Sequence, residues 1–104
     1  MHIPKDLIVT SYQRFQWTVF ESLTEERVFV SYYYESGHFQ GDVVVELDDD
    51  EKLNFNAHAV DFLRNQLQEV KGDYNGLLKT KHIFNFHKIV DSSKLIAVWK
   101  KMQL

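Results

Sequence analysis

Cysteine is absent from the 104 residues, proline occurs once and glycine four times. Without cysteine the chain has no disulfide, and no thiolate is present for metal binding or nucleophilic chemistry. The longest uninterrupted apolar run, residues 95–99, is far too short to cross a bilayer. The first six residues lack the long apolar segment of a signal peptide. We therefore expect a cytoplasmic protein that does not associate with a membrane.

The short motifs of common active sites are also missing. The chain contains no Gly-x-Ser-x-Gly sequence, no glycine-rich phosphate loop and no calcium-loop pattern. Of the five histidines, His82 and His87 lie five positions apart, so their side chains diverge on a helix and oppose each other on a strand. We therefore expect no enzyme, no catalytic residue, no metal and no cofactor.

Apolar residues are abundant enough for a folded core. They make up 44% of the chain, and aromatic residues make up 14%. A chain of this length and composition typically folds as one domain with a substantial hydrophobic core. We found no internal repeat and no linker, so we predict a single α+β domain over residues 1–104.

A β-hairpin over residues 27–48 is the clearest structural prediction. Val28, Val30 and Tyr32 alternate with other side chains, as residues on one face of a strand do. A turn sequence containing Gly37 follows, and in the return run valine alternates with acidic residues. This alternation predicts an antiparallel sheet with one buried face and one wet face.

Residues 5–23 have two interpretations. Apolar side chains recur at intervals of four, three, four and four residues, the spacing of one face of an amphipathic helix. These residues are Ile8, Tyr12, Phe15, Val19 and Leu23. The stretch is also rich in β-branched and aromatic residues, which favour a strand. Because no turn residue interrupts the five-membered stripe, we expect a helix and keep a strand as the alternative.

A second helix is predicted over residues 57–71. Its apolar residues repeat at helical spacing and are expected to pack on the sheet; they are Val60, Leu63, Leu67 and Val70. Asn56 is the expected N-cap, and Gly72 is the expected left-handed residue after the helix. Two further strands are predicted near 78–90 and 94–100, which gives an antiparallel sheet of about four strands packed against helix 57–71. For the last segment, a helix capped by Ser92 is the alternative.

Charge is distributed unevenly along the chain. Residues 1–70 contain 13 Asp or Glu against 5 Lys or Arg, a net charge of −8, whereas residues 71–104 contain 2 against 7, a net charge of +5. Six acidic residues and no basic one occur between positions 42 and 51: Asp42, Glu46, Asp48, Asp49, Asp50 and Glu51. One interpretation is a solvated loop at 48–51. The other is an acidic ridge that binds a basic partner.

Aromatic residues are candidate anchors for a partner. Residues 32–34 are consecutive tyrosines, so neighbouring rings point to opposite faces of a strand. An exposed Tyr33 beside Glu35, or Trp17, would add contact area at low entropic cost, whereas a sheet covered on both faces would bury the tyrosines. The lysines after residue 70 are scattered and the chain is acidic overall, so we do not expect nucleic-acid binding.

The segment 20–26, which is FESLTEE, and the apolar run 28–34 resemble those of small bacterial immunity proteins. The likeness extends over about half of the chain. It includes the YezG-like group and the immunity proteins of contact-dependent inhibition. The resemblance implies an inhibitor that binds and neutralises a cognate toxin. Many such toxins are nucleases with basic clefts, in which an acidic patch competes with phosphate and speeds encounter. It further implies that the six acidic residues steer binding and that Trp17 or Tyr33 supplies buried area.

Two alternatives remain open at the level of sequence. The first is a small-molecule or enzymatic pocket between helix 57–71 and the sheet, which requires a cavity with convergent polar groups. The second is a homo-oligomeric module, at its simplest a homodimer, that shares the tyrosine-rich strand as a common edge.

Overall fold

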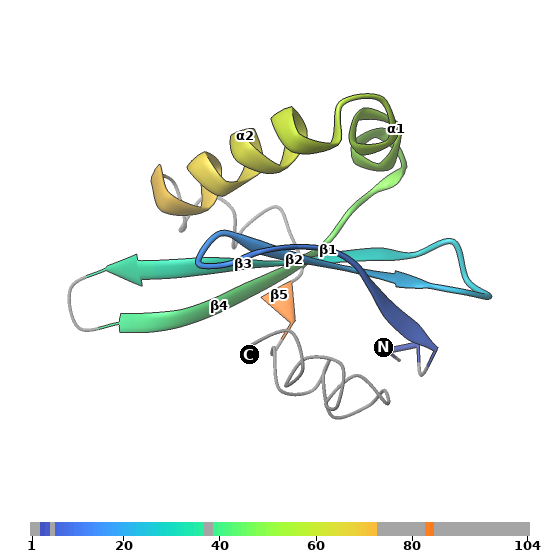
Figure 1. Ribbon diagram of the computed structural model, residues 1–104, viewed down its shortest axis with the longest axis horizontal. Helices are drawn as coiled ribbons and strands as arrows, with labels where there is room; N and C mark the ends of the chain where they lie inside the picture. The colour runs from blue at the N-terminus through green and yellow to red at the C-terminus, as the bar shows by residue number, and fades with distance from the viewer. Residues whose placement is uncertain (1–2, 5, 37–38, 73–82, 85–104) are drawn as a thin grey trace.

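The structure is a computed structural model that describes residues 3–4, 6–36, 39–72 and 83–84. These residues form an antiparallel sheet and two helices, which confirms the predicted α+β fold. The strands are β1 (Leu7–Gln13), β2 (Trp17–Ser22), β3 (Val28–Ser36), β4 (Phe39–Glu46) and the short β5 (Ile83–Phe84). The helices are α1 (Asp49–Ala57) and α2 (Ala59–Gly72). Both helices lie over the same face of the sheet (Figure 1).

The predicted hairpin is confirmed as β3 and β4. The two strands are antiparallel, with Val30 opposite Val45 and Tyr32 opposite Val43. On its other side β3 pairs with β2, so the tyrosine-rich strand is an inner strand of the sheet. The proposal that this strand is a shared edge between two copies is therefore wrong, because its backbone hydrogen bonds are already made within the molecule.

The prediction of a helix over residues 5–23 is wrong, and the alternative of a β conformation is correct. Residues 7–22 form the antiparallel pair β1–β2, joined by a turn in which the Gln16 N–H donates to the Gln13 carbonyl at 3.0 Å. The expected helical stripe is not a buried face, because Ile8, Phe15 and Leu23 are 39%, 62% and 68% exposed. The β-branched and aromatic composition decided the conformation here.

The main core lies between the sheet and α2. It contains Trp17 and Val19 of β2, Val28, Val30 and Tyr32 of β3, Val43 and Val45 of β4, Leu47, and Leu63, Leu67 and Val70 of α2. Helix 57–71 is thus confirmed as α2, with its apolar stripe packed as expected except for Val60, which is 50% exposed. These side chains fill the space between the helix and the sheet, where the alternative of a ligand pocket required a cavity.

The opposite face of the sheet is also buried, which corrects the expectation of one wet face. A second cluster contains Leu7, Phe20, Phe29 and Val44, with Ile3 and Val9 packed against it. Phe20, Phe29 and Val44 are completely buried. Consecutive apolar residues in β3 and β4, including the valines of 43–45, supply both faces and explain why simple alternation was misleading.

Three local predictions around the helices are wrong. Residues 48–51 are not a loop, because Asp48 is the N-cap of α1 and residues 49–51 form its first turn. Asn56 lies inside α1, where an N-cap of the next helix was expected. Gly72 is the last residue of α2 and has no left-handed φ. The predicted strand near 78–90 is described only at residues 83–84, which form β5 beside β4. The predicted strand at 94–100 lies outside the described residues.

Candidate functional site

Helix α1 is specified by hydrogen bonds at its N-terminus. The Asp48 carboxylate accepts from the Glu51 N–H at 2.9 Å, and the Glu51 carboxylate accepts from the Asp48 N–H at 2.9 Å. This reciprocal capping box satisfies backbone donors that the helix itself leaves unpaired. Asp49 and Asp50 follow in the first turn, where negative charge interacts favourably with the helix dipole. The acidic run therefore has a clear local role.

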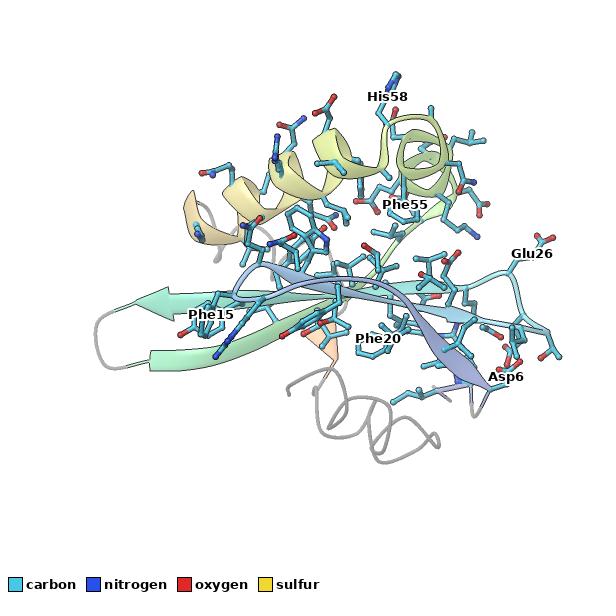
Figure 2. The ribbon with its side chains drawn as sticks, viewed as in Figure 1. Asp6, Phe15, Phe20, Glu26, Phe55 and His58 are labelled. Atoms are coloured by element: carbon cyan, nitrogen blue, oxygen red, sulfur yellow. The ribbon has the colours of Figure 1, made fainter. Side chains whose placement is uncertain are left out.

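Helix α1 nevertheless contributes little to the core. None of its residues is buried. Phe55 points from α1 towards the sheet (Figure 2) and meets Phe62 edge-on, with ring centroids 6.3 Å apart. Such a helix depends on its caps and on a few contacts for its position.

A chain of polar side chains connects α1 to the core. The buried Tyr32 hydroxyl donates to the side-chain oxygen Oε1 of Gln66 at 2.5 Å. The side-chain Nε2 of Gln66 in turn donates to the Glu51 carboxylate at 2.8 Å. Burial raises the pKa of Tyr32, so its hydroxyl remains protonated and able to donate throughout the physiological range. The same Glu51 that caps α1 is therefore fixed to α2 and, through it, to β3.

The segment between β2 and β3 is held by Asp6. Its carboxylate accepts from the Thr24 hydroxyl at 2.7 Å, the Thr24 N–H at 2.8 Å and the Ser22 hydroxyl at 2.9 Å. The Thr24 hydroxyl and the other donors together hold the pKa of Asp6 below its ordinary value. This network fixes the course of residues 22–26, which we call the β2–β3 turn.

Arg27 and Glu46 form a two-pronged ion pair at the base of this turn. The Arg27 Nε and Nη2 atoms each lie 2.8 Å from a carboxylate oxygen of Glu46. The hydrogen bonds to Glu46 raise the pKa of Arg27. The guanidinium also lies over the Phe29 ring, 4.9 Å from its centroid. The charge of Glu46 is neutralised by Arg27, its bidentate partner. Glu46 therefore stabilises the fold and contributes little to the long-range attraction of a partner.

A cleft of about 490 Å³ separates α1 from the β2–β3 turn. It is lined by Glu21, Ser22, Glu25, Glu26, Arg27, Val28, Asp49, Lys52, Leu53 and Asn56. We call it the acidic cleft, because four carboxylates face two cations and one of these cations is paired with Glu46. The Lys52 ammonium donates to the Glu26 carbonyl at 2.7 Å and lies 3.1 Å from the Asp49 carboxylate.

Two leucines expose large apolar surfaces beside these charges. Leu53, on α1, lines the acidic cleft and is 69% exposed. Leu23, in the β2–β3 turn, is 68% exposed. An exposed apolar side chain within a charged rim is the arrangement found at the centre of many protein interfaces.

The residues predicted to bind a partner differ in their exposure to solvent. Trp17 is 6% exposed and belongs to the main core, so it is not an accessible anchor. Tyr33 is half-buried, whereas Asp48, Asp49 and Asp50 are exposed and Glu51 is half-buried. The side chains of Glu35 and Asp42 lie outside the described part of the structure. The predicted acidic residues that the structure leaves exposed are therefore those at the start of α1.

Several site residues were missed because tertiary structure brings them together. Glu21, Glu25 and Glu26 lie more than twenty positions from Asp49, yet they line the same cleft. Leu53 belongs to α1, a helix that the sequence analysis did not predict. The capping-box spacing of Asp48 and Glu51 could have revealed the helix that exposes it.

The turn between β1 and β2 carries a second exposed feature. Phe15 has a φ of 61° and is 62% exposed. The Arg14 guanidinium lies 4.9 Å from the centroid of the Phe15 ring, and the Tyr33 ring meets Phe15 edge-on at 5.5 Å. We call Arg14 and Phe15 the aromatic tip. Figure 2 shows Phe15 and Glu26 at opposite ends of the sheet.

Among the described residues, no group of three His, Asp or Glu side chains is arranged to hold a metal ion. None of the described helices combines the length and apolar character needed to cross a membrane. A comparison of the chain with protein-family models, curated proteins and solved structures finds no match.

Proposed function

We propose that this protein is an immunity-type inhibitor that binds and neutralises a basic protein toxin, most simply a nuclease. The supporting observation is the conformation of α1. This helix is capped at its N-terminus and fixed by Gln66, yet it buries none of its residues. Its half-buried Phe55 packs against the core, and the rest of the helix remains available to present a binding surface.

The surface consists of α1 and the β2–β3 turn. Asp49 and Asp50 of α1 and the glutamates of the acidic cleft provide the negative charge, and Leu53 provides an apolar centre. A nuclease binds phosphate with a basic surface, so carboxylates that occupy that surface exclude the substrate. Their field also accelerates the encounter between the two proteins at low salt. Leu53 replaces Trp17 and Tyr33 as the expected anchor.

A ligand pocket between α2 and the sheet is less favoured than a protein interface. Leu63, Leu67 and Val70 of α2 occupy that space together with the valines of the sheet. The acidic cleft lies elsewhere and is lined by several charged side chains, whereas small-molecule sites are mostly lined by apolar groups.

The proposal is tested by measuring affinity for a toxin domain encoded by a neighbouring gene. Isothermal titration calorimetry should show that Asp49→Lys with Asp50→Lys weakens binding at least about tenfold and flattens its salt dependence. Leu53→Ala should weaken binding by a similar factor. The matched control is Asp61→Lys with Glu69→Lys, which changes the charge equally at exposed positions of α2.

The control should bind nearly as well as the wild type. Equal affinities for the wild type, the α1 double variant and Leu53→Ala would exclude this surface as the binding site. A neighbouring toxin that does not bind the wild-type protein at all would overturn the proposed function itself.

A further inference from the structure

Phe15 occupies an unfavourable position for a residue that serves only stability. Its φ of 61° lies in the left-handed region, which is unfavourable for a residue with a Cβ atom. Phe15 is 62% exposed, so burial of its side chain offsets little of this strain. Unfavourable backbone conformations of this kind are concentrated at binding and catalytic sites. The aromatic tip is therefore a candidate recognition element.

The chemistry of the tip defines what it can bind. Phe15 offers an apolar ring, and Arg14 adds a positive charge 4.9 Å from the centre of that ring. Tyr33 supports the ring from the sheet, with its centroid 5.5 Å away. The complementary surface is a recess with an apolar wall and a surplus of carboxylates.

The molecule carries such a recess at its other end. The acidic cleft, at about 490 Å³, is large enough to admit an aromatic ring and is lined by Leu53 and Val28 together with four carboxylates. Phe15 and Glu26 mark opposite ends of the sheet (Figure 2), so the tip cannot enter the cleft of its own molecule. A second copy can supply it.

We propose that the aromatic tip of one molecule docks in the acidic cleft of another, so that the chain self-associates head to tail. Phe15 enters beside Leu53, and Arg14 meets the carboxylates of the cleft. Two different surfaces form this contact, so every added copy leaves one tip and one cleft open, and the assembly grows unless it closes into a ring. This inference does not depend on the proposed function, although a partner bound in the cleft would compete with self-association.

The experiment uses sedimentation velocity on the purified full chain from micromolar to millimolar concentration. The average mass of the wild type should rise with concentration. Phe15→Gly removes the tip, and Leu53→Glu adds charge and removes the apolar wall of the cleft; each should weaken association at least about tenfold. Both positions are exposed, so each variant is expected to fold, which circular dichroism checks.

Mixing the two variants distinguishes this contact from other modes of association. Phe15→Gly retains a wild-type cleft and Leu53→Glu retains a wild-type tip, so the mixture should form a one-to-one dimer and nothing larger. Val60→Glu, at an exposed position of α2, should associate as the wild type does. The inference fails if the wild type stays monomeric at millimolar concentration, if the mixture does not dimerise, or if only one of the two variants loses association.

Discussion

At the level of single residues, the backbone at Phe15 reverses the usual effect of glycine. At this φ of 61° an alanine retains the Cβ strain that a glycine avoids. Both substitutions remove the ring contacts with Arg14 and Tyr33, so the comparison isolates the backbone. Urea unfolding should show Phe15→Gly to be more stable than Phe15→Ala by about 1 kcal/mol.

The control pair lies in an ordinary helical position. At the exposed Asn65 of α2, alanine should be the more stable of the two by about 1 kcal/mol. Should alanine also be the more stable residue at position 15, the left-handed conformation of Phe15 would be incorrect.

Asp6 gives the β2–β3 turn a defined dependence on pH. Hydrogen bonds from Thr24 and Ser22 hold its pKa below the ordinary value, so the folded protein binds the Asp6 proton less readily than the unfolded chain does. Its stabilising contribution is therefore complete above the unfolded pKa, near pH 4, and is lost as the pH falls through the lower folded pKa.

Asp6→Asn should remove this contribution. Thermal unfolding between about pH 6 and pH 2 should show that the difference in stability between wild type and variant is largest near neutral pH and narrows in acid. A difference that stays constant across the whole range would mean that the Asp6 carboxylate is not titrating as the hydrogen bonds require.

At the level of elements, α1 should unfold separately from the rest of the domain. Asp48→Ala removes one half of the capping box and should cost the helix about 1 kcal/mol. Because α1 buries none of its residues, the loss should remain local. Amide hydrogen exchange should accelerate in residues 49–57 and change little in α2.

Asp50→Ala is the matched comparison. Asp50 lies in the first turn of the same helix but is not part of the capping box. This substitution should have a smaller effect on exchange in α1 than Asp48→Ala. If protection in α2 falls as much as in α1, the two helices form one cooperative unit and the local interpretation is wrong.

The elements that the sequence predicted correctly are those in which composition and position agree. The hairpin has two runs of β-branched and aromatic residues on either side of a glycine-containing sequence, and α2 has three leucine and valine positions that are buried at helical spacing. Residues 5–23 satisfied a helical spacing by coincidence. Their turn at 13–16 contains no glycine, proline, asparagine or aspartate, so nothing in the sequence marked the boundary between two strands.

Helix α1 was missed for a different reason. Its two large apolar residues, Leu53 and Phe55, are two positions apart and form no helical stripe, so hydrophobic periodicity could not detect it. The acidic run at 48–51 was interpreted only through its charge, although the spacing of Asp48 and Glu51 is that of a capping box. The acidic residues at the start of α1 could therefore be singled out in the sequence, but the proximity of the glutamates of the β2–β3 turn and the exposure of Leu53 required the tertiary structure.

At the level of the whole molecule, both faces of the sheet should contribute comparably to stability. Phe20 is fully buried on one face, and Leu63 of α2 is 1% exposed against the other. Phe20→Ala should lower the free energy of unfolding by about 3–5 kcal/mol, and Leu63→Ala by about 2–5 kcal/mol. Chemical denaturation measures both effects.

A single wet face, as the alternation of β4 predicted, gives a different result. In that case Phe20→Ala would cost less than about 1 kcal/mol, as substitutions at exposed sites do. Leu53→Ala serves as the internal reference for an exposed apolar residue, since Leu53 is 69% exposed.

The order of the strands also has a consequence for how the chain reaches its structure. In the sheet β1 to β5 lie in the same order as in the sequence, so each strand pairs with the one that precedes it. The pairings from β1 to β4 require only short loops to be closed, whereas β5 joins β4 after both helices. Proteins dominated by local contacts fold faster than those with distant pairings. The hairpin β1–β2 can therefore form on the ribosome before α2 has been synthesised. Each later strand then pairs with the edge strand that has already formed.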